Sequence, residues 1–231
     1  MSDNSYAGAQ ARTNTILKNV YLWMTTGLTL TGLVAYFASG SGLVMAIAQN
    51  PLLFFAMIIG QLGLVIFLSA RISRLSPQAA TGFFLLYATL NGILFSYIFL
   101  VYTGTTIAST FFVTAGTFAG MSLYALTTKE DLTKYGRYLI MALWGLILAS
   151  VVNMFLGSSG LNWLISYAGV LIFVGLTAYD TQVIARWSKH MTGNVSAADF
   201  TRMSIMGALK LYLDFINLFL FFLRIFGGGR S

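Results

Sequence analysis

The sequence predicts an all-α membrane protein, a bundle of seven transmembrane helices, and three observations lead to this fold class. Of its 231 residues 58% are hydrophobic and only 8% are charged, whereas a soluble globular domain carries about 25% charged residues. No charged residue occurs in the runs 19–70, 75–128 and 138–179. Each run is about twice the ~20 residues that one α-helix needs to cross the hydrocarbon core, so each predicts a helical hairpin. The same counts exclude a soluble enzyme.

Turn-forming residues divide these runs into single spans. Clusters of Gly, Ser, Thr and Asn between apolar segments are typical of turns, and they occur at 39–42, 49–51, 103–106 and 157–160. A polar stretch, 186–202, precedes a last apolar segment. The predicted spans are therefore 19–38, 52–70, 79–102, 107–127, 138–156, 161–184 and 204–226. In the fourth, Gly116 and Gly120 have the GxxxG spacing that lets helices approach closely, which predicts tight packing there.

The domain organisation follows from these spans. We expect an N-terminal segment (1–18), one transmembrane domain (19–226) and a short C-terminal tail (227–231). Ten basic residues fall on the side of the N-terminus, in that segment and in the loops after the second, fourth and sixth spans. Short cytoplasmic loops are enriched in Lys and Arg, so the N-terminus is predicted to be cytoplasmic. Seven full spans would place the C-terminus on the opposite, outer side, whereas a re-entrant last segment would return it to the cytoplasmic side.

Composition also limits the partners and chemistry. The net charge of +7 is explained by the basic loops, so the bilayer, and no nucleic acid, is the expected partner. The chain has no cysteine and one histidine, and it contains no HExxH sequence or phosphate-binding loop. We therefore expect neither an enzyme nor a bound cofactor.

Three charged residues stand out away from the ends of the predicted spans: Asp180 in the sixth, and Lys210 and Asp214 in the seventh. Charged side chains are costly in a bilayer, usually face the bundle interior and often have a function. At 1.5 Å per residue, Asp214 lies roughly 18 Å from Arg202, and Asp180 about 9 Å from Arg186. Because consecutive spans are antiparallel, the two carboxylates are expected to meet in the cytoplasmic half of the bundle.

Two paired carboxylates suit both a proton and a cation. Two such groups in a low-dielectric site cannot both ionise cheaply, so they should titrate as one coupled unit. Together with Thr181, Asn217, carbonyls and waters, they would also form a weak Ca²⁺ site, because Ca²⁺ takes 6–8 oxygen ligands. The alternative is structural: Lys210 pairs with one of the two aspartates and serves only packing.

Segments 175–182 (GLTAYDTQ) and 211–219 (LYLDFINLF) closely resemble the two signatures of the Bax inhibitor-1 (TMBIM) family. Segment 91–116 is similar to that family's third and fourth spans, and the resemblance extends over nearly the whole chain. It is closest to bacterial members, which implies the bacterial inner membrane. The resemblance also implies a seven-helix bundle with the last helix at its centre.

The same resemblance implies a pH-sensitive Ca²⁺ leak. In the family, paired aspartates that share a proton are thought to close a cytoplasmic gate, helped by an arginine on the second helix. These positions match Asp180 and Asp214, which would be the gate and pH sensor, and Arg71, which would be the latch. Arg74 is the next best match for the arginine.

Three hypotheses for the function follow. The first is a Ca²⁺ leak channel gated by protonation of Asp180 and Asp214. The second is an exchanger of Ca²⁺ for H⁺ at the same pair, since carboxylates that trade a proton for a cation suit that chemistry equally. The third is a non-conducting membrane scaffold or stress regulator that uses its basic cytoplasmic face to meet anionic lipid or a partner.

Overall fold

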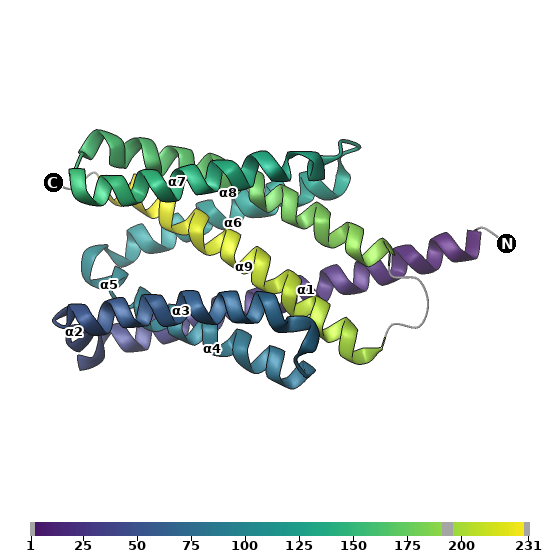
Figure 1. Cartoon of the computed structure of the whole chain (residues 1–231), viewed down its shortest axis with the longest axis horizontal. Helices are drawn as coiled ribbons and strands as arrows, with labels where there is room; N and C mark the ends of the chain where they lie inside the picture. Colours follow the sequence, from purple (N-terminus) through teal and green to yellow (C-terminus); the bar gives the residue numbers. More distant parts are fainter. Residues whose placement is uncertain (1–2, 191–195, 229–231) are drawn as a thin grey trace. The chain divides into compact units, whose positions relative to one another are not determined.

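The computed structural model describes residues 3–190 and 196–228, which are helical almost throughout and contain no strand (Figure 1). Seven segments are long and apolar enough to cross a membrane: Asn14–Ser39, Pro51–Arg74, Pro77–Val101, Gly104–Thr127, Leu132–Leu156, Ser159–Lys189 and Ala197–Gly227. Each overlaps one predicted span, so the predicted fold class and all seven spans are confirmed. The predicted N-terminal segment is helical from Asp3 onward, and most of the predicted tail lies outside the described residues.

The helices have these bounds: α1 (Asp3–Ser39), α2 (Gly42–Ala48), α3 (Pro51–Arg71), α4 (Pro77–Phe95), α5 (Ile98–Val101), α6 (Gly104–Thr127), α7 (Gly136–Leu156), α8 (Ser159–His190) and α9 (Ala197–Gly227). Two short 3₁₀ helices follow α3 and α6: η1 (Ile72–Arg74) and η2 (Leu132–Tyr135). The third predicted span is therefore made of α4 and α5, which the short connection at Ser96 separates.

Both prolines of the chain begin a helix. Pro51 and Pro77 occupy the first positions of α3 and α4, where the missing N–H costs no hydrogen bond. Asn50 caps α3 by accepting from the N–H of Leu53, and Ser76 caps α4 in the same way. A side-chain acceptor at this position satisfies one of the free N–H groups of the first turn. Local chemistry thus fixes where these two spans start.

The polar stretch 186–202, which the sequence assigned to a loop, is helical at 186–190 and 197–202, while 191–195 lie outside the described residues. α8 continues to His190, and α9 begins at Ala197. The hydroxyl of Ser196 caps α9 by accepting from the N–H of Asp199, and it donates to the carboxylate of the same residue. The assignment to a loop was wrong because polarity marks where a span leaves the hydrocarbon, whereas a helix ends only where its backbone is capped or broken.

The chain divides into two compact units, each described here by itself. Unit 1 consists of Met1–Thr103 and Ser188–Tyr212, and unit 2 of Gly104–Trp187 and Leu213–Ser231. Helix α9 contributes its first half to unit 1 and its second half to unit 2. It is also the most buried of the seven candidate spans. The predicted single domain and the predicted central position of α9 stay predictions.

In unit 1, α1 packs mainly against α4, and α3 packs against α4. The hydroxyl of Thr31 donates to the carbonyl of Ala88 at 2.9 Å and lies 2.7 Å from the hydroxyl of Tyr212. At Gly92, an added Cβ would lie 2.7 Å from both the Thr31 carbonyl oxygen and the Val34 Cβ. The two helices approach so closely here that only glycine fits at position 92.

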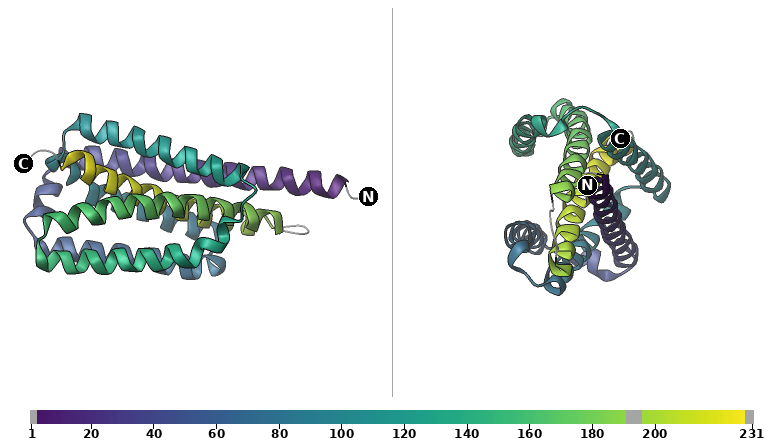
Figure 2. Two further views of the ribbon diagram at one scale, coloured as in Figure 1. Left: turned by 90° about the horizontal axis from the view of Figure 1, so that it is seen from above. Right: turned by 90° about the vertical axis from the view of Figure 1, so that its right-hand side faces the viewer.

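In unit 2, α7 and α8 lie side by side with a tight connection between them (Figures 1 and 2). Gly157 ends α7 in the left-handed conformation, with φ of 61°, which a residue without Cβ adopts at no steric cost. The core of the unit joins α7, α8 and α9 through five buried residues: Leu146, Ile165, Phe173, Leu176 and Leu218.

The GxxxG sequence on α6 does not form the tight contact that its spacing predicts. Gly116 and Gly120 are exposed, and among the described residues no atom beyond the adjacent residues and backbone of α6 itself lies within 4 Å of a Cβ built on either one. Their spacing permits a close approach but does not require one. The close approaches are made at other glycines, including Gly92 and Gly136.

We expect Gly92→Ala to lower the melting temperature of the purified protein, because overpacking of a tight contact typically costs about 1–3 kcal/mol. Gly82→Ala on the same helix is the matched control, since its Cβ would meet nothing within 4 Å. There, alanine should leave stability unchanged or raise it, because glycine inside a helix is unfavourable by roughly 0.5–1 kcal/mol. Thermal unfolding of both variants in one detergent is the measurement, and equal melting temperatures would contradict the tight contact at Gly92.

Candidate functional site

The two aspartates inside the membrane spans are both buried, Asp180 on α8 and Asp214 on α9. The packing around them gives the register of the two helices. Phe173 and Phe221 stack with their ring centroids 5.8 Å apart, and Leu176 and Leu218 share one buried cluster. From the first pair to the second, the position on α8 rises by three residues and the position on α9 falls by three. The two helices are therefore antiparallel here. One further helical turn brings both aspartates to the same level and the same face.

Helix α6 supports this placement independently. The hydroxyl of Ser122 lies 3.3 Å from that of Thr181, which follows Asp180 in the chain. One turn earlier on α6, Phe118 packs against Phe215, which follows Asp214, with ring centroids 5.6 Å apart. The neighbours of the two aspartates therefore contact adjacent turns of one helix. All of these residues belong to unit 2.

The three predicted supporting residues, Thr181, Lys210 and Asn217, lie on the same two helices. Thr181 is fully buried, and its hydroxyl faces α6. Asn217 is half-buried and donates its amide to the carbonyl of Leu213 one turn earlier. Lys210 is half-buried one turn before Asp214, in the part of α9 that belongs to unit 1. Its support of the pair stays a prediction.

Arg71, the predicted latch, ends α3 in unit 1 and is exposed, as is Arg74 at the end of η1. Both stand at the start of the short connection to α4, as the charge pattern predicted. Because the aspartates belong to unit 2, the latch role of Arg71 stays a prediction.

A face of α6 with buried hydroxyl groups was missed in the sequence. Its buried residues follow one another at helical spacing: Thr110, Thr114, Phe118, Ser122 and Ala125. Thr114 donates to the carbonyl of Thr110, so its oxygen keeps acceptor capacity. Three hydroxyls at four- or eight-residue intervals in an apolar span were the signal for this face. Hydroxyl oxygens are hard ligands, which suit a permeating cation such as Ca²⁺. They can also relay a proton.

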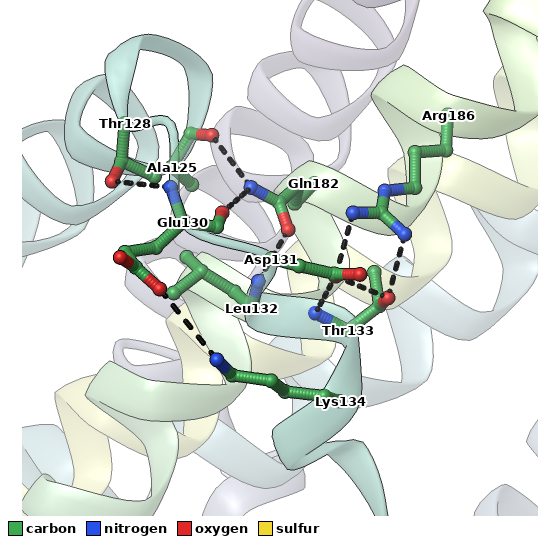
Figure 3. Close-up of polar contacts among 9 residues, drawn as sticks. All are labelled: Ala125, Thr128, Glu130, Asp131, Leu132, Thr133, Lys134, Gln182 and Arg186. Atoms are coloured by element: carbon green, nitrogen blue, oxygen red, sulfur yellow. Dashed lines mark hydrogen bonds and ion pairs between the residues drawn. The ribbon is translucent and has the colours of Figure 1, made fainter.

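Gln182 is a second residue that the sequence did not single out, and Figure 3 shows its surroundings. Its carboxamide oxygen accepts from the N–H of Leu132 at 2.6 Å, and its nitrogen donates to the carbonyls of Glu130 (2.9 Å) and Ala125 (3.4 Å). The last four carbonyls of a helix lack partners within it, and Ala125 is one of those of α6. One buried side chain thus satisfies the end of α6 and the connection that follows it.

Arg186 adds a second link between α8 and the same connection (Figure 3). Its guanidinium forms an ion pair with Asp131 at 2.6 Å and donates to the hydroxyl of Thr133 at 2.8 Å. Hydrogen bonds from Thr133 and the nearby Arg186 hold the pKa of Asp131 below its usual value. The Arg186 and Asp131 side chains are 41% and 50% exposed, so water and salt screen their attraction.

The arrangement limits the chemistry of the site. Among the described residues, no three Asp, Glu, His or Cys side chains come together as a metal site. A divalent cation at the aspartates would therefore take most of its ligands from hydroxyls, carbonyls and water, which makes for weak binding. Weak binding favours passage over storage, because a permeating ion must also leave.

Comparison with known proteins identifies the family. The profile of the family described as "Inhibitor of apoptosis-promoting Bax1" matches residues 13–231. The inner membrane protein YbhL of Escherichia coli K12 is 50% identical over 231 residues, covering 98% of this chain and 97% of its own. An uncharacterized protein of Borreliella burgdorferi is 49% identical, with 94% of each chain covered. RP147 of Rickettsia prowazekii is 41% identical, covering 92% of this chain and 89% of its own. The chain therefore belongs to the Bax inhibitor-1 family of multi-pass membrane proteins.

Proposed function

We propose that this protein is a pH-sensitive Ca²⁺ leak channel of the bacterial inner membrane, gated by Asp180 and Asp214. The observation that supports the proposal most is that both carboxylates are buried, one turn beyond the packed residues of the antiparallel helices α8 and α9. Two carboxylates inside a membrane are energetically costly, and ionisable residues at such positions usually mark functional sites. The buried hydroxyls of α6, which reach α8 at Ser122, supply further oxygen donors beside it.

The proposed mechanism uses the pair as a proton-controlled gate. When the two carboxylates share one proton, a hydrogen bond between them holds α8 and α9 together. Loss of that proton leaves two like charges side by side, which repel each other in a medium of low dielectric constant. The helices are then pushed apart at this level, and a cation is attracted to the same two groups. Arg71 is the proposed latch on the cytoplasmic side, with the N-terminus also in the cytoplasm.

We expect Asp180→Asn and Asp214→Asn each to flatten the dependence of Ca²⁺ flux on pH. An amide does not titrate, so each variant removes the coupled proton while keeping the size of the side chain. The Ca²⁺ flux of the wild-type protein should differ about tenfold or more between pH 5 and pH 8. A difference of one pKa unit between the closed and open states already changes the ratio of their populations about tenfold. The measurement is Ca²⁺ entry into liposomes that contain the purified protein.

Glu130→Gln is the matched control for this experiment. Glu130 is an exposed carboxylate whose ion pair with Lys134 is also exposed, so its loss should leave the pH profile unchanged. An unaltered profile in both aspartate variants would refute the gate. Flux no higher than in empty liposomes at any pH would refute the channel and favour the scaffold.

A pH gradient separates the channel from the exchanger. With equal Ca²⁺ on both sides and no membrane potential, we expect an imposed pH gradient to cause no net Ca²⁺ accumulation, because a channel does not couple the two ions. An exchanger would accumulate Ca²⁺ in a fixed ratio to the protons that leave. A Ca²⁺ indicator and a pH indicator in the same liposomes measure both fluxes, with ionophores that clamp the potential.

A further inference from the structure

One face of α8 is directed at the segment that connects α6 to α7. Tyr179, Gln182 and Arg186 follow one another at spacings of three and four residues, so they share a face of the helix. All three contact residues 125–136, which we call the clasp segment. The ring of Tyr179 lies against Gly136, where an added Cβ would come within 2.7 Å of three of its atoms. Gln182 and Arg186 make the hydrogen bonds and the ion pair described above (Figure 3).

These contacts differ in strength along the helix. Gln182 is buried, and its loss would leave the N–H of Leu132 and two carbonyls without their partner in a place that water reaches poorly. The Arg186–Asp131 pair is half exposed, so it opens easily and weakens with salt. The clasp segment is therefore held firmly at Gln182 and loosely at Arg186, which lies four residues further along α8.

The residues between Tyr179 and Gln182 belong to the candidate site. Asp180 and Thr181 occupy the intervening positions, with Thr181 against Ser122 of α6. A single helical turn thus carries the buried carboxylate of Asp180, a hydroxyl that faces α6 and a carboxamide that faces the clasp segment. Any movement of this turn away from the clasp segment also moves Asp180.

We propose that the clasp segment positions the turn of α8 that carries Asp180, and that its release is a conformational step that opens the cytoplasmic side of the site. Gln182 and Arg186 are then positioning residues, which act through Asp180. The effect of release on flux rests on the proposed function, whereas the positioning of α8 does not.

Hydrogen exchange of the full-length protein in lipid nanodiscs tests the positioning directly. In Gln182→Leu, we expect amide exchange to become at least about tenfold faster both in residues 128–135 and in the α8 turn 179–184, because exchange reports local opening. Lys134→Ala is the matched control, because it removes an exposed ion pair with Glu130 that lies wholly inside the clasp segment. It should leave exchange in α8 unchanged.

A charge exchange tests the outer link without removing a buried group. Arg186→Asp alone should speed exchange of the clasp segment, and the double variant with Asp131→Arg should restore it in part. This pair of variants keeps the test valid if Gln182→Leu fails to fold. Faster exchange in residues 128–135 with no change in the α8 turn would overturn the proposal, and so would unchanged exchange in both segments.

Ca²⁺ flux into liposomes tests the consequence for the channel. At a fixed pH, Gln182→Leu and Arg186→Asp should raise flux severalfold, and the double variant should lower it toward the wild-type value. If the wild-type protein conducts and loosening of α8 leaves flux unchanged, the clasp segment is structural and its gating role is refuted. If the wild-type protein does not conduct, the proposed function fails, while the exchange data still decide the positioning of α8.

Discussion

The low dielectric constant of the bilayer interior is the constraint on which the rest of this structure depends. Every polar group inside it needs a partner from the protein, because lipid offers none. This requirement confines 15 of the 19 charged residues to segments outside the predicted spans. It also accounts for the hydroxyls that bond to carbonyls one turn earlier in their own helix, as Thr114 and Thr177 do. The aspartates on α8 and α9 are exceptions that need a specific environment.

Helix α8 supplies much of that environment because its successive residues face different neighbours. Leu176 shares a buried cluster with Leu218 of α9, and Thr181 faces Ser122 of α6. Gln182 faces the clasp segment. Since a helix turns by about 100° per residue, three consecutive polar residues reach three different surroundings. A short polar sequence in an apolar span can thus join three parts of unit 2 without leaving its own hydrogen-bonding groups exposed to lipid.

Much of the fold could be predicted because the signals for it are local. Runs without charge set the spans, and the two prolines with their capping residues begin two helices within two residues of the predicted starts. The burial of Asp180 and Asp214 could also be predicted from the sequence, because a charged side chain inside a span is costly to expose to lipid and therefore faces the protein interior. The antiparallel arrangement of consecutive spans was enough to expect them at a similar depth.

The contacts that could not be predicted are those that depend on which helix faces pack against each other. Gly92 and Gly116 are both glycines in apolar helices, yet only the first lies against another helix. Gln182 is recognisable as a polar residue near the end of a span, but its partners are backbone groups about fifty residues away. Backbone groups carry no sequence signal of their own, since every residue except proline has the same N–H and C=O. For this reason a side chain that binds backbone is found only once the helices are placed, although it can position a functional group as effectively as an ion pair does.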